Sequence, residues 1–236
     1  MNKTLSLISC LSLMMSAVAT DRPALADEIQ VTDEKSAASQ QYHFRVFVDD
    51  IEVGIHRYDV EQLGGQQHVK SVADFKYKWS FVTLYDYQHQ NHEIWSDGCL
   101  ARIESSTDAN GEDYSVLGEQ SDQGFVVNGK DGQQMLPACV QTFAYWDPKF
   151  LDADKLLNSQ NGEYLDVKVT GPEPDVLQLH GQEQPASRYR LTAGKLDLQL
   201  WYSASGEWLG LQSRTESGRM LRTSCCRRKK PLPLPR

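Results

Sequence analysis

Alternating apolar and polar residues recur along the chain in short segments, and this two-residue period constrains the fold more than any other feature. The pattern is clearest in residues 42–48 and 196–202, where every second residue is apolar. Successive side chains of a β-strand point to opposite faces of a sheet, so these segments predict strands with one buried and one solvated face.

Turn-forming dipeptides separate these segments at steady intervals. Asp97-Gly98 and Asn110-Gly111 favour the tight turns that join antiparallel strands, because Gly takes positive φ without steric cost. The pattern predicts an all-β, mainly antiparallel fold. Such a sheet must bury its apolar face, and a closed barrel, a half-barrel wrapped on a helix or a sandwich would do so. The lone short helix that the sequence predicts favours a curved meander that forms a half-barrel or an open barrel. Asp147 followed by Pro148 predicts one short helix with Asp147 as its N-cap.

Residues 1–26 have the layout of a secretory signal peptide. A short positive segment, residues 1–3, precedes an apolar run over residues 5–18, and Ala24-Leu25-Ala26 offers a cleavage site of small residues. The apolar run is too short to span a membrane as a helix, and no second such run follows. We therefore expect a periplasmic protein without an integral membrane segment in its mature chain. A lipoprotein signal is the weaker alternative, since Cys10 leaves almost no apolar region before it.

The rest of the chain divides into three parts by composition. Residues 27–40 are polar and lack periodicity, so we expect a disordered lead-in. Residues 41–221 are expected to form a single antiparallel β domain. Residues 222–236 are basic and rich in proline, and we expect a disordered tail. The full chain has a formal net charge of -8, and its acidic body argues against nucleic acid as a partner.

Four of the five cysteines follow the signal segment, and they indicate disulfide chemistry. In an exported chain, paired cysteines usually form disulfides, and Cys99 with Cys139 is the natural pair. The remaining two, Cys225 and Cys226, are adjacent and cannot easily face one ion from a strand. Because the chain also lacks a CxxC motif, we expect neither a metal site nor a cofactor.

His89, His92 and Glu93 raise the question of a catalytic or metal site. Strand residues three positions apart face opposite sides, so only His89 and Glu93 would share a face, and a catalytic zinc needs three protein ligands. We interpret these residues as solvated polar groups near a strand end. Familiar hydrolase motifs are missing, and we expect no catalytic residues and no enzyme activity. The alternative is an envelope hydrolase with a rim site at His92, Glu93 and Asp97.

Aromatic residues concentrate on the predicted strands and have two interpretations. They could form ordinary core and cross-strand packing, or they could line an apolar cavity inside a curved sheet. Periodicity alone does not separate the two. The candidates for a ligand-binding cavity wall are Phe75, Tyr77, Trp79, Phe81, Trp95, Tyr145, Trp146 and Trp201.

Four longer segments and two short ones read together as a family pattern. The longer ones are FVDDIEVG (47–54), EIWSDGCL (93–100), FAYWDP (143–148) and LLNSQNGE (156–163), and the short ones are Leu200-Trp201-Tyr202 and Trp208-Leu209. Together they resemble an uncharacterised family of bacterial exported proteins, catalogued as domain of unknown function 6134, over roughly residues 41–221.

This resemblance implies a fold but no established activity. The family is similar in pattern to the curved sheets of periplasmic lipoprotein carriers, which implies a half-barrel around a greasy groove. The chain departs from the pattern near Arg222, where Cys225-Cys226 and the proline-rich end replace an ordinary strand, as a shifted reading frame would produce.

Two functional hypotheses follow from these observations. We expect the protein to bind an apolar or lipid-like small molecule, or to act as a cell-envelope scaffold that contacts another envelope protein. A fully packed interior would argue against the ligand. A structural domain that pairs through an exposed sheet edge is a third interpretation.

Overall fold

The computed structural model describes residues 39–79, 82–179, 181–215 and 217–225, apart from the side chains of Trp79, Val82 and Cys225. The chain divides into two units, Met1–Lys35 and Ser36–Arg236, and the second contains all the elements below. The expected signal peptide, most of the expected lead-in, Phe81 and the tail from residue 226 lie outside the described residues.

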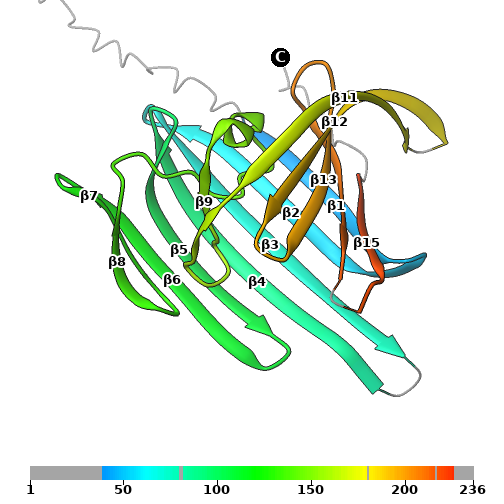
Figure 1. The fold of residues 1–236 in the computed structure, drawn as a ribbon, viewed down its shortest axis with the longest axis horizontal. Helices are drawn as coiled ribbons and strands as arrows, with labels where there is room; N and C mark the ends of the chain where they lie inside the picture. Colours follow the sequence, from blue (N-terminus) through cyan, green and yellow to red (C-terminus); the bar gives the residue numbers. More distant parts are fainter. Residues whose placement is uncertain (1–38, 80–81, 180, 216, 226–236) are drawn as a thin grey trace, which may run out of the picture. The chain divides into compact units, whose positions relative to one another are not determined.

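One large antiparallel sheet of thirteen strands dominates the described part of the chain (Figure 1). Its order is β11-β12-β13-β14-β15-β1-β2-β3-β4-β5-β6-β7-β8, so the first and last strands of the domain meet in the middle of the sheet. The strands are β1 (Ser39–Val48), β2 (Ile51–Leu63), β3 (Gln66–Trp79), β4 (Val82–Ser96), β5 (Cys99–Ala109), β6 (Glu112–Ser121), β7 (Gly124–Gly129), β8 (Gly132–Leu136), β11 (Lys168–Leu179), β12 (Gln182–Ala193), β13 (Leu196–Tyr202), β14 (Trp208–Arg214) and β15 (Met220–Cys225).

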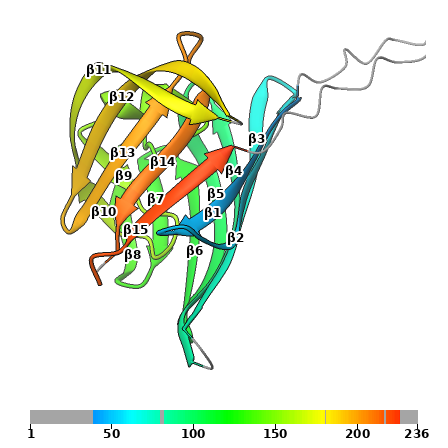
Figure 2. The same cartoon turned by 90° about the vertical axis from the view of Figure 1, so that its right-hand side faces the viewer.

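The sheet curves strongly but does not close, as the expected half-barrel requires. Strands β11 to β15 form one flank and β2 to β6 the other (Figure 2). Buried apolar side chains from both flanks belong to one core cluster. Alternating burial along β1, with Phe44 and Val46 almost fully buried, matches the alternation in the sequence. The expected all-β, antiparallel fold is confirmed.

Local backbone chemistry fixes the turns and the bend. Asp97 and Asn110 adopt φ of 51° and 59° and are followed by glycines at 78° and 84°, so both expected hairpin turns are confirmed. Gly54 lies opposite a register shift between Val46 and Phe47 of β1. A Cβ atom at Gly54 would approach the carbonyl oxygen of Asp74 to 2.0 Å, so close backbone approach requires glycine there.

A crossover segment, residues 137–167, connects β8 to β11 and packs inside the curve of the sheet. It contains a 3₁₀ turn, η1 (Pro148–Asp152), and a small hairpin of β9 (Lys155–Leu157) and β10 (Tyr164–Asp166). Asp147 caps η1 as expected, since its Oδ1 accepts a hydrogen bond from the Lys149 amide at 3.1 Å. The turn η1 ends at Asp152, because Ala153 is extended and the chain continues into β9.

Aromatic packing and two tyrosine hydroxyls hold the crossover against the sheet. Trp208 of β14 lies 4.1 Å from the Phe44 ring and 5.2 Å from the Tyr145 ring, between centroids. The hydroxyl of Tyr42 donates to the Trp146 carbonyl at 3.3 Å, and that of Tyr202 donates to the Tyr145 carbonyl at 3.0 Å. These contacts join β1, β13 and β14 to one segment of the crossover.

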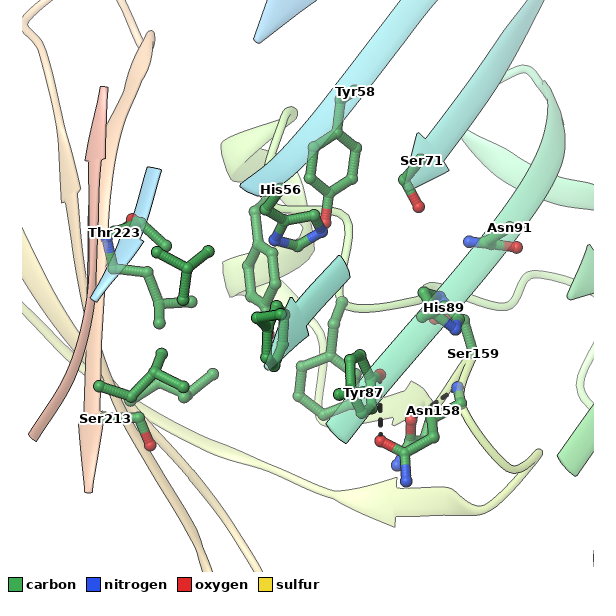
Figure 3. Close-up of a pocket in the computed structure, with 18 of the residues that line it drawn as sticks. His56, Tyr58, Ser71, Tyr87, His89, Asn91, Asn158, Ser159, Ser213 and Thr223 are labelled. Carbon is green, nitrogen blue, oxygen red and sulfur yellow. Dashed lines mark hydrogen bonds between the residues drawn. The ribbon is translucent and has the colours of Figure 1, made fainter. Parts of the chain in front are cut away.

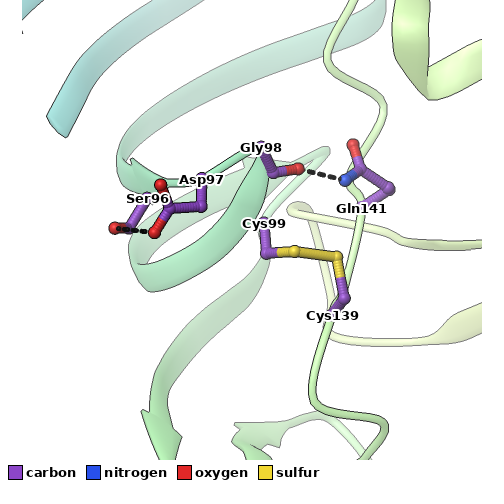
Figure 4. The surroundings of a disulfide bond; sticks show 6 residues. All are labelled: Ser96, Asp97, Gly98, Cys99, Cys139 and Gln141. Atoms are coloured by element: carbon purple, nitrogen blue, oxygen red, sulfur yellow. Dashed lines mark hydrogen bonds between the residues drawn. A yellow bond between two sulfur atoms is a disulfide. The ribbon is translucent and has the colours of Figure 1, made fainter.

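A disulfide between Cys99 and Cys139 fastens the start of the crossover to the β4–β5 turn (Figure 4). The Leu100 amide donates to the Val140 carbonyl at 3.0 Å, and the Gln141 side chain donates to the Gly98 carbonyl at 2.5 Å. The expected disulfide is therefore confirmed, and one main-chain and one side-chain hydrogen bond hold the same two segments together beside it.

The edges of the domain differ from those expected from composition. β1 begins at Ser39 and β15 continues to Cys225, so residues 39–40 and 222–225 belong to the sheet. Arg222 to Cys225 pair in register with Phe47 to Phe44 of β1. Their main-chain hydrogen bonds depend on backbone geometry, so the pairing forms although the side chains there lack a regular apolar pattern.

Replacing both cysteines with alanine should lower the free energy of unfolding, because the bridge restricts the unfolded chain. The cysteines are 40 residues apart, and a loop of that length corresponds to roughly 4 kcal/mol in the chain-entropy model. Chemical denaturation of the double variant and of the oxidised protein measures the difference. Equal midpoints for the two proteins would contradict this role.

Candidate functional site

Two adjacent hollows open on the inner face of the half-barrel, and together they form the candidate site. The inner cavity has a volume of about 310 Å³ and the outer cavity about 1130 Å³. Both have walls from β3, β4, the crossover, β13 and β15, because they share Phe75, Tyr85, Gln160, Leu196 and Leu221. The outer cavity also borders the β1–β2, β5–β6, β12–β13 and β14–β15 turns. It therefore lies at the end of the half-barrel where these turns gather, and we call it the mouth of the site.

Polar side chains line the inner cavity in cross-strand rows (Figure 3). The first row holds His56, Ala73, His89 and Thr107 at matching positions of β2, β3, β4 and β5. Neighbouring strands lie about 4.8 Å apart, so the backbones of the two histidines are about 10 Å apart with only a methyl group between them. The row therefore places two imidazoles beside one hollow.

Hydrogen bonds to the crossover fix the orientation of His89. Its Nδ1 lies 2.8 Å from the Thr107 hydroxyl, which donates to the Gln160 carbonyl at 3.2 Å. Because a hydroxyl has a single hydrogen, Nδ1 of His89 is then the donor in the first of these bonds. The other ring nitrogen, Nε2, is left as a hydrogen-bond acceptor.

The second row places Tyr58, Ser71, Asn91 and Ser105 side by side on the same four strands. Ser105 donates to the Ser159 carbonyl at 2.5 Å and so contacts the crossover. The Asn91 amide donates from Nδ2, whereas its buried Oδ1 has no hydrogen-bond partner. A buried acceptor without a partner is costly, so this position lowers the stability of the folded protein.

Glu93 continues the same face of β4 and is only 3% exposed. Its carboxylate accepts from Asn91 Nδ2 at 2.9 Å and from Trp95 Nε1 at 3.0 Å. Burial raises the pKa of Glu93, and these two hydrogen bonds oppose that shift. The carboxyl group thus lies at the inner end of the polar rows, held by neutral donors.

The inner cavity is almost free of formal charge at neutral pH. Burial lowers the pKa of His56 to about 3, with a further contribution from His89, and lowers the pKa of His89 to about 4. Burial raises the pKa of Tyr58. Among the described residues that line this cavity there is no lysine or arginine, and Glu93 is the only acidic residue. The cavity therefore presents uncharged hydrogen-bonding groups beside apolar ones.

The outer cavity differs because cationic side chains surround it. Lys195, Arg214 and Arg219 border it together with Glu112. Arg219 pairs with Asp49 at 3.0 Å, and its guanidinium lies 5.1 Å from the centre of the Tyr77 ring. The mouth therefore combines positive charge with aromatic surface.

The structure brings three of the predicted cavity residues together at the hollows. Phe75 borders both cavities, Tyr77 the outer one and Tyr145 the inner one. Their part in ligand binding stays a prediction. The side chain of Trp79 and the whole of Phe81 lie outside the described residues.

The other three predicted cavity residues lie elsewhere. Trp95 and Trp146 pack edge to face at 5.7 Å in the core, where the crossover fills the interior. Trp201 alternates with the core residue Leu200 on β13, and its indole donates to Asp175 at 2.8 Å. Periodicity gives the face of a strand but not what packs on that face, so these three side chains border neither of the two hollows.

The rim site at His92, Glu93 and Asp97 is not assembled. His92 and Glu93 are consecutive on β4 and face opposite sides; Glu93 is buried, whereas His92 lies beside His68 at 5.8 Å. Asp97 is exposed in the hairpin turn. The interpretation of His89 and Glu93 as solvated was also wrong, since both are buried on the inner face.

A signal for the polar rows was present in the sequence. The odd-numbered residues of β4 share one face of the strand. His89 and Glu93 lie on this face between the aromatic residues Tyr87 and Trp95. The aromatic neighbours indicate that this face is the inner one. The polar stretch between them hides the alternation, because both faces of the strand are hydrophilic there.

Among the described residues, no three His, Cys, Asp or Glu side chains gather closely enough to hold a metal ion. Within that part of the chain, no helix is long and apolar enough to cross a membrane.

The fold and the hollow define an open, β-barrel-like antiparallel protein with a cavity on its inner face. A model of the family described as Domain of unknown function (DUF6134) matches residues 44–225, and the chain belongs to this family. A search of curated proteins finds no match. The comparisons indicate no catalytic family.

Solved structures support the same architecture. One of them, a β-barrel-like protein of the domain of unknown function DUF1849 from Brucella abortus, is similar with a TM-score of 0.59 and 8% sequence identity. The similarity covers 79% of this chain and 95% of that one. At this identity the likeness concerns the fold alone.

The neutral histidines predict that acid destabilises the protein. The pKa of a histidine in the unfolded chain is near 6.5, whereas burial lowers the pKa of His56 to about 3 and that of His89 to about 4. Between these values the unfolded chain binds more protons, so the free energy of unfolding falls as pH falls below 6.5, by about 2 kcal/mol for each histidine at pH 5. Glu93 acts in the opposite direction, because its pKa is raised on folding.

Denaturant unfolding at pH 7 and pH 5 measures this effect. A variant with His56→Gln and His89→Gln should lose much less stability between the two pH values than the original protein. The same pH slope in both proteins would show that the two imidazoles are not held neutral.

Proposed function

We propose that this protein is an exported cell-envelope protein that holds an amphipathic, lipid-like small molecule in its inner and outer cavities. The observation that carries the proposal is the pair of adjacent hollows with shared aromatic and aliphatic walls. Typical small-molecule sites occupy about 300–1,000 Å³, are mostly apolar, and contain a few convergent polar groups. These hollows have comparable size and composition.

The construction of the domain supports a ligand-holding role. The crossover occupies one part of the interior, and the disulfide and tyrosine hydroxyls hold it there. The remaining interior lies under the turns at the mouth, where a ligand can enter without unfolding the sheet. A purely structural domain gains more from filling such a hollow with side chains.

Export is also a proposal, and two features support it. Residues 1–26 have the sequence layout of a signal peptide. The Cys99–Cys139 disulfide suits an oxidising compartment such as the periplasm. Contact with another envelope protein stays a prediction. Along the β11 edge, Pro172 and Pro174 remove main-chain donors and disfavour strand pairing.

A cavity-filling substitution tests the proposed function. Leu196 is half-buried and borders both cavities, so Leu196→Trp should block the passage between them. We expect at least about a tenfold loss of affinity for phenylnaphthylamine, an uncharged aromatic probe, which corresponds to about 1.4 kcal/mol. Fluorescence titration of the purified protein measures the binding.

Leu117→Trp is the matched control, because Leu117 is 53% exposed on β6 and borders neither cavity. It adds the same indole and should leave the affinity unchanged. Equal binding by both variants, or no saturable binding by the original protein, would overturn the proposed function.

A further inference from the structure

The two hollows differ in the charge that they can accommodate. The inner cavity has neutral polar groups and one buried carboxyl, Glu93, whereas the mouth has Lys195, Arg214 and Arg219. A ligand carboxylate or phosphate in the inner cavity would lose its hydration and face Glu93 without a cation to compensate. The same group at the mouth would meet positive charge and solvent. An amphipathic ligand is therefore oriented by its charge.

The inner cavity also has hydrogen-bonding groups that an apolar end of a ligand would leave without partners. His89 has an acceptor nitrogen, Nε2, once its Nδ1 binds Thr107. His89 borders this cavity, as does Ser71 on the neighbouring strand. A hydrocarbon chain placed here would exclude water from the imidazole nitrogen and the Ser71 hydroxyl and leave them unsatisfied. A group with O–H or N–H donors would satisfy them.

The volume limits the size of that group. The inner cavity has a volume of about 310 Å³. Each molecule of liquid water takes up about 30 Å³, so this volume corresponds to roughly ten water molecules. This space suits a compact ring with several donors, such as a single sugar, and is too small for a large oligosaccharide. Aromatic walls from Phe75, Tyr87 and Tyr145 suit the flat faces of such a ring.

We infer that the inner cavity selects an amphipathic ligand by its buried end, an uncharged group that carries hydroxyl or amide donors and is about the size of one sugar ring. Any anionic group of the ligand stays at the mouth beside Lys195 and Arg214. This inference rests on the proposed function and adds the class and orientation of the ligand.

Two probes with the same eight-carbon tail test the inference. n-Octyl glucoside has an uncharged, hydroxylated end, and octanoate has an anionic end without donors. Each competes with phenylnaphthylamine for the protein at concentrations below micelle formation. We expect the glucoside to bind at least about tenfold more tightly than octanoate, as expected for one or two added hydrogen bonds.

Variants of the polar rows locate the discrimination. His89→Leu removes the acceptor nitrogen and should weaken glucoside binding by about tenfold, with little effect on octanoate. Ser71→Ala is the milder second variant, with the same direction and a smaller loss, in case His89→Leu fails to fold. Gln90→Leu, on the exposed face of the same strand, is the control and should bind both probes normally.

The outcomes separate this inference from the proposed function. Saturable binding of phenylnaphthylamine with no preference for the glucoside, or equal losses for both probes in the variants, would overturn the inference alone. If no probe binds, both the inference and the proposed function are overturned.

Discussion

The crossover between β8 and β11 packs against the inner face of the sheet, and the form of the interior depends on this contact. Leu156 and Leu157 are fully buried, and Trp208 of the sheet stacks against Tyr145 of the crossover. A sheet of this curvature could otherwise close on itself and fill its interior with its own side chains. With the crossover in place, the flanks stay apart and a hollow remains beside the filled region.

The polar rows of the inner face carry a cost that ordinary packing does not explain. Apolar side chains at Asn91, His89 and Glu93 would continue the core of the sheet at lower desolvation cost. The chain instead holds an unpaired acceptor, two neutral imidazoles and a buried carboxyl beside one hollow. Residues that sacrifice stability in this way are typical of binding sites, and this supports the inference that the inner cavity receives the polar end of a ligand.

Much of the fold was predictable from sequence, and much of the site was not. Alternation and the Asp97-Gly98 turn predict the antiparallel curved sheet, and the cysteine count predicts the disulfide, because these are local or pairwise signals. The cavity depends on which inner positions the crossover covers, and that is a long-range property. Trp95 and His89 share the inner parity of β4, yet Trp95 is packed under the crossover and His89 faces the hollow.

Native mass spectrometry of the protein, isolated gently from its natural host, tests the central claim most directly. The account predicts a species heavier than the polypeptide by one amphipathic molecule with an uncharged, hydroxyl- or amide-bearing group, and loss of that species in Leu196→Trp. The polypeptide mass alone, in both proteins, would contradict the claim that the half-barrel holds a ligand.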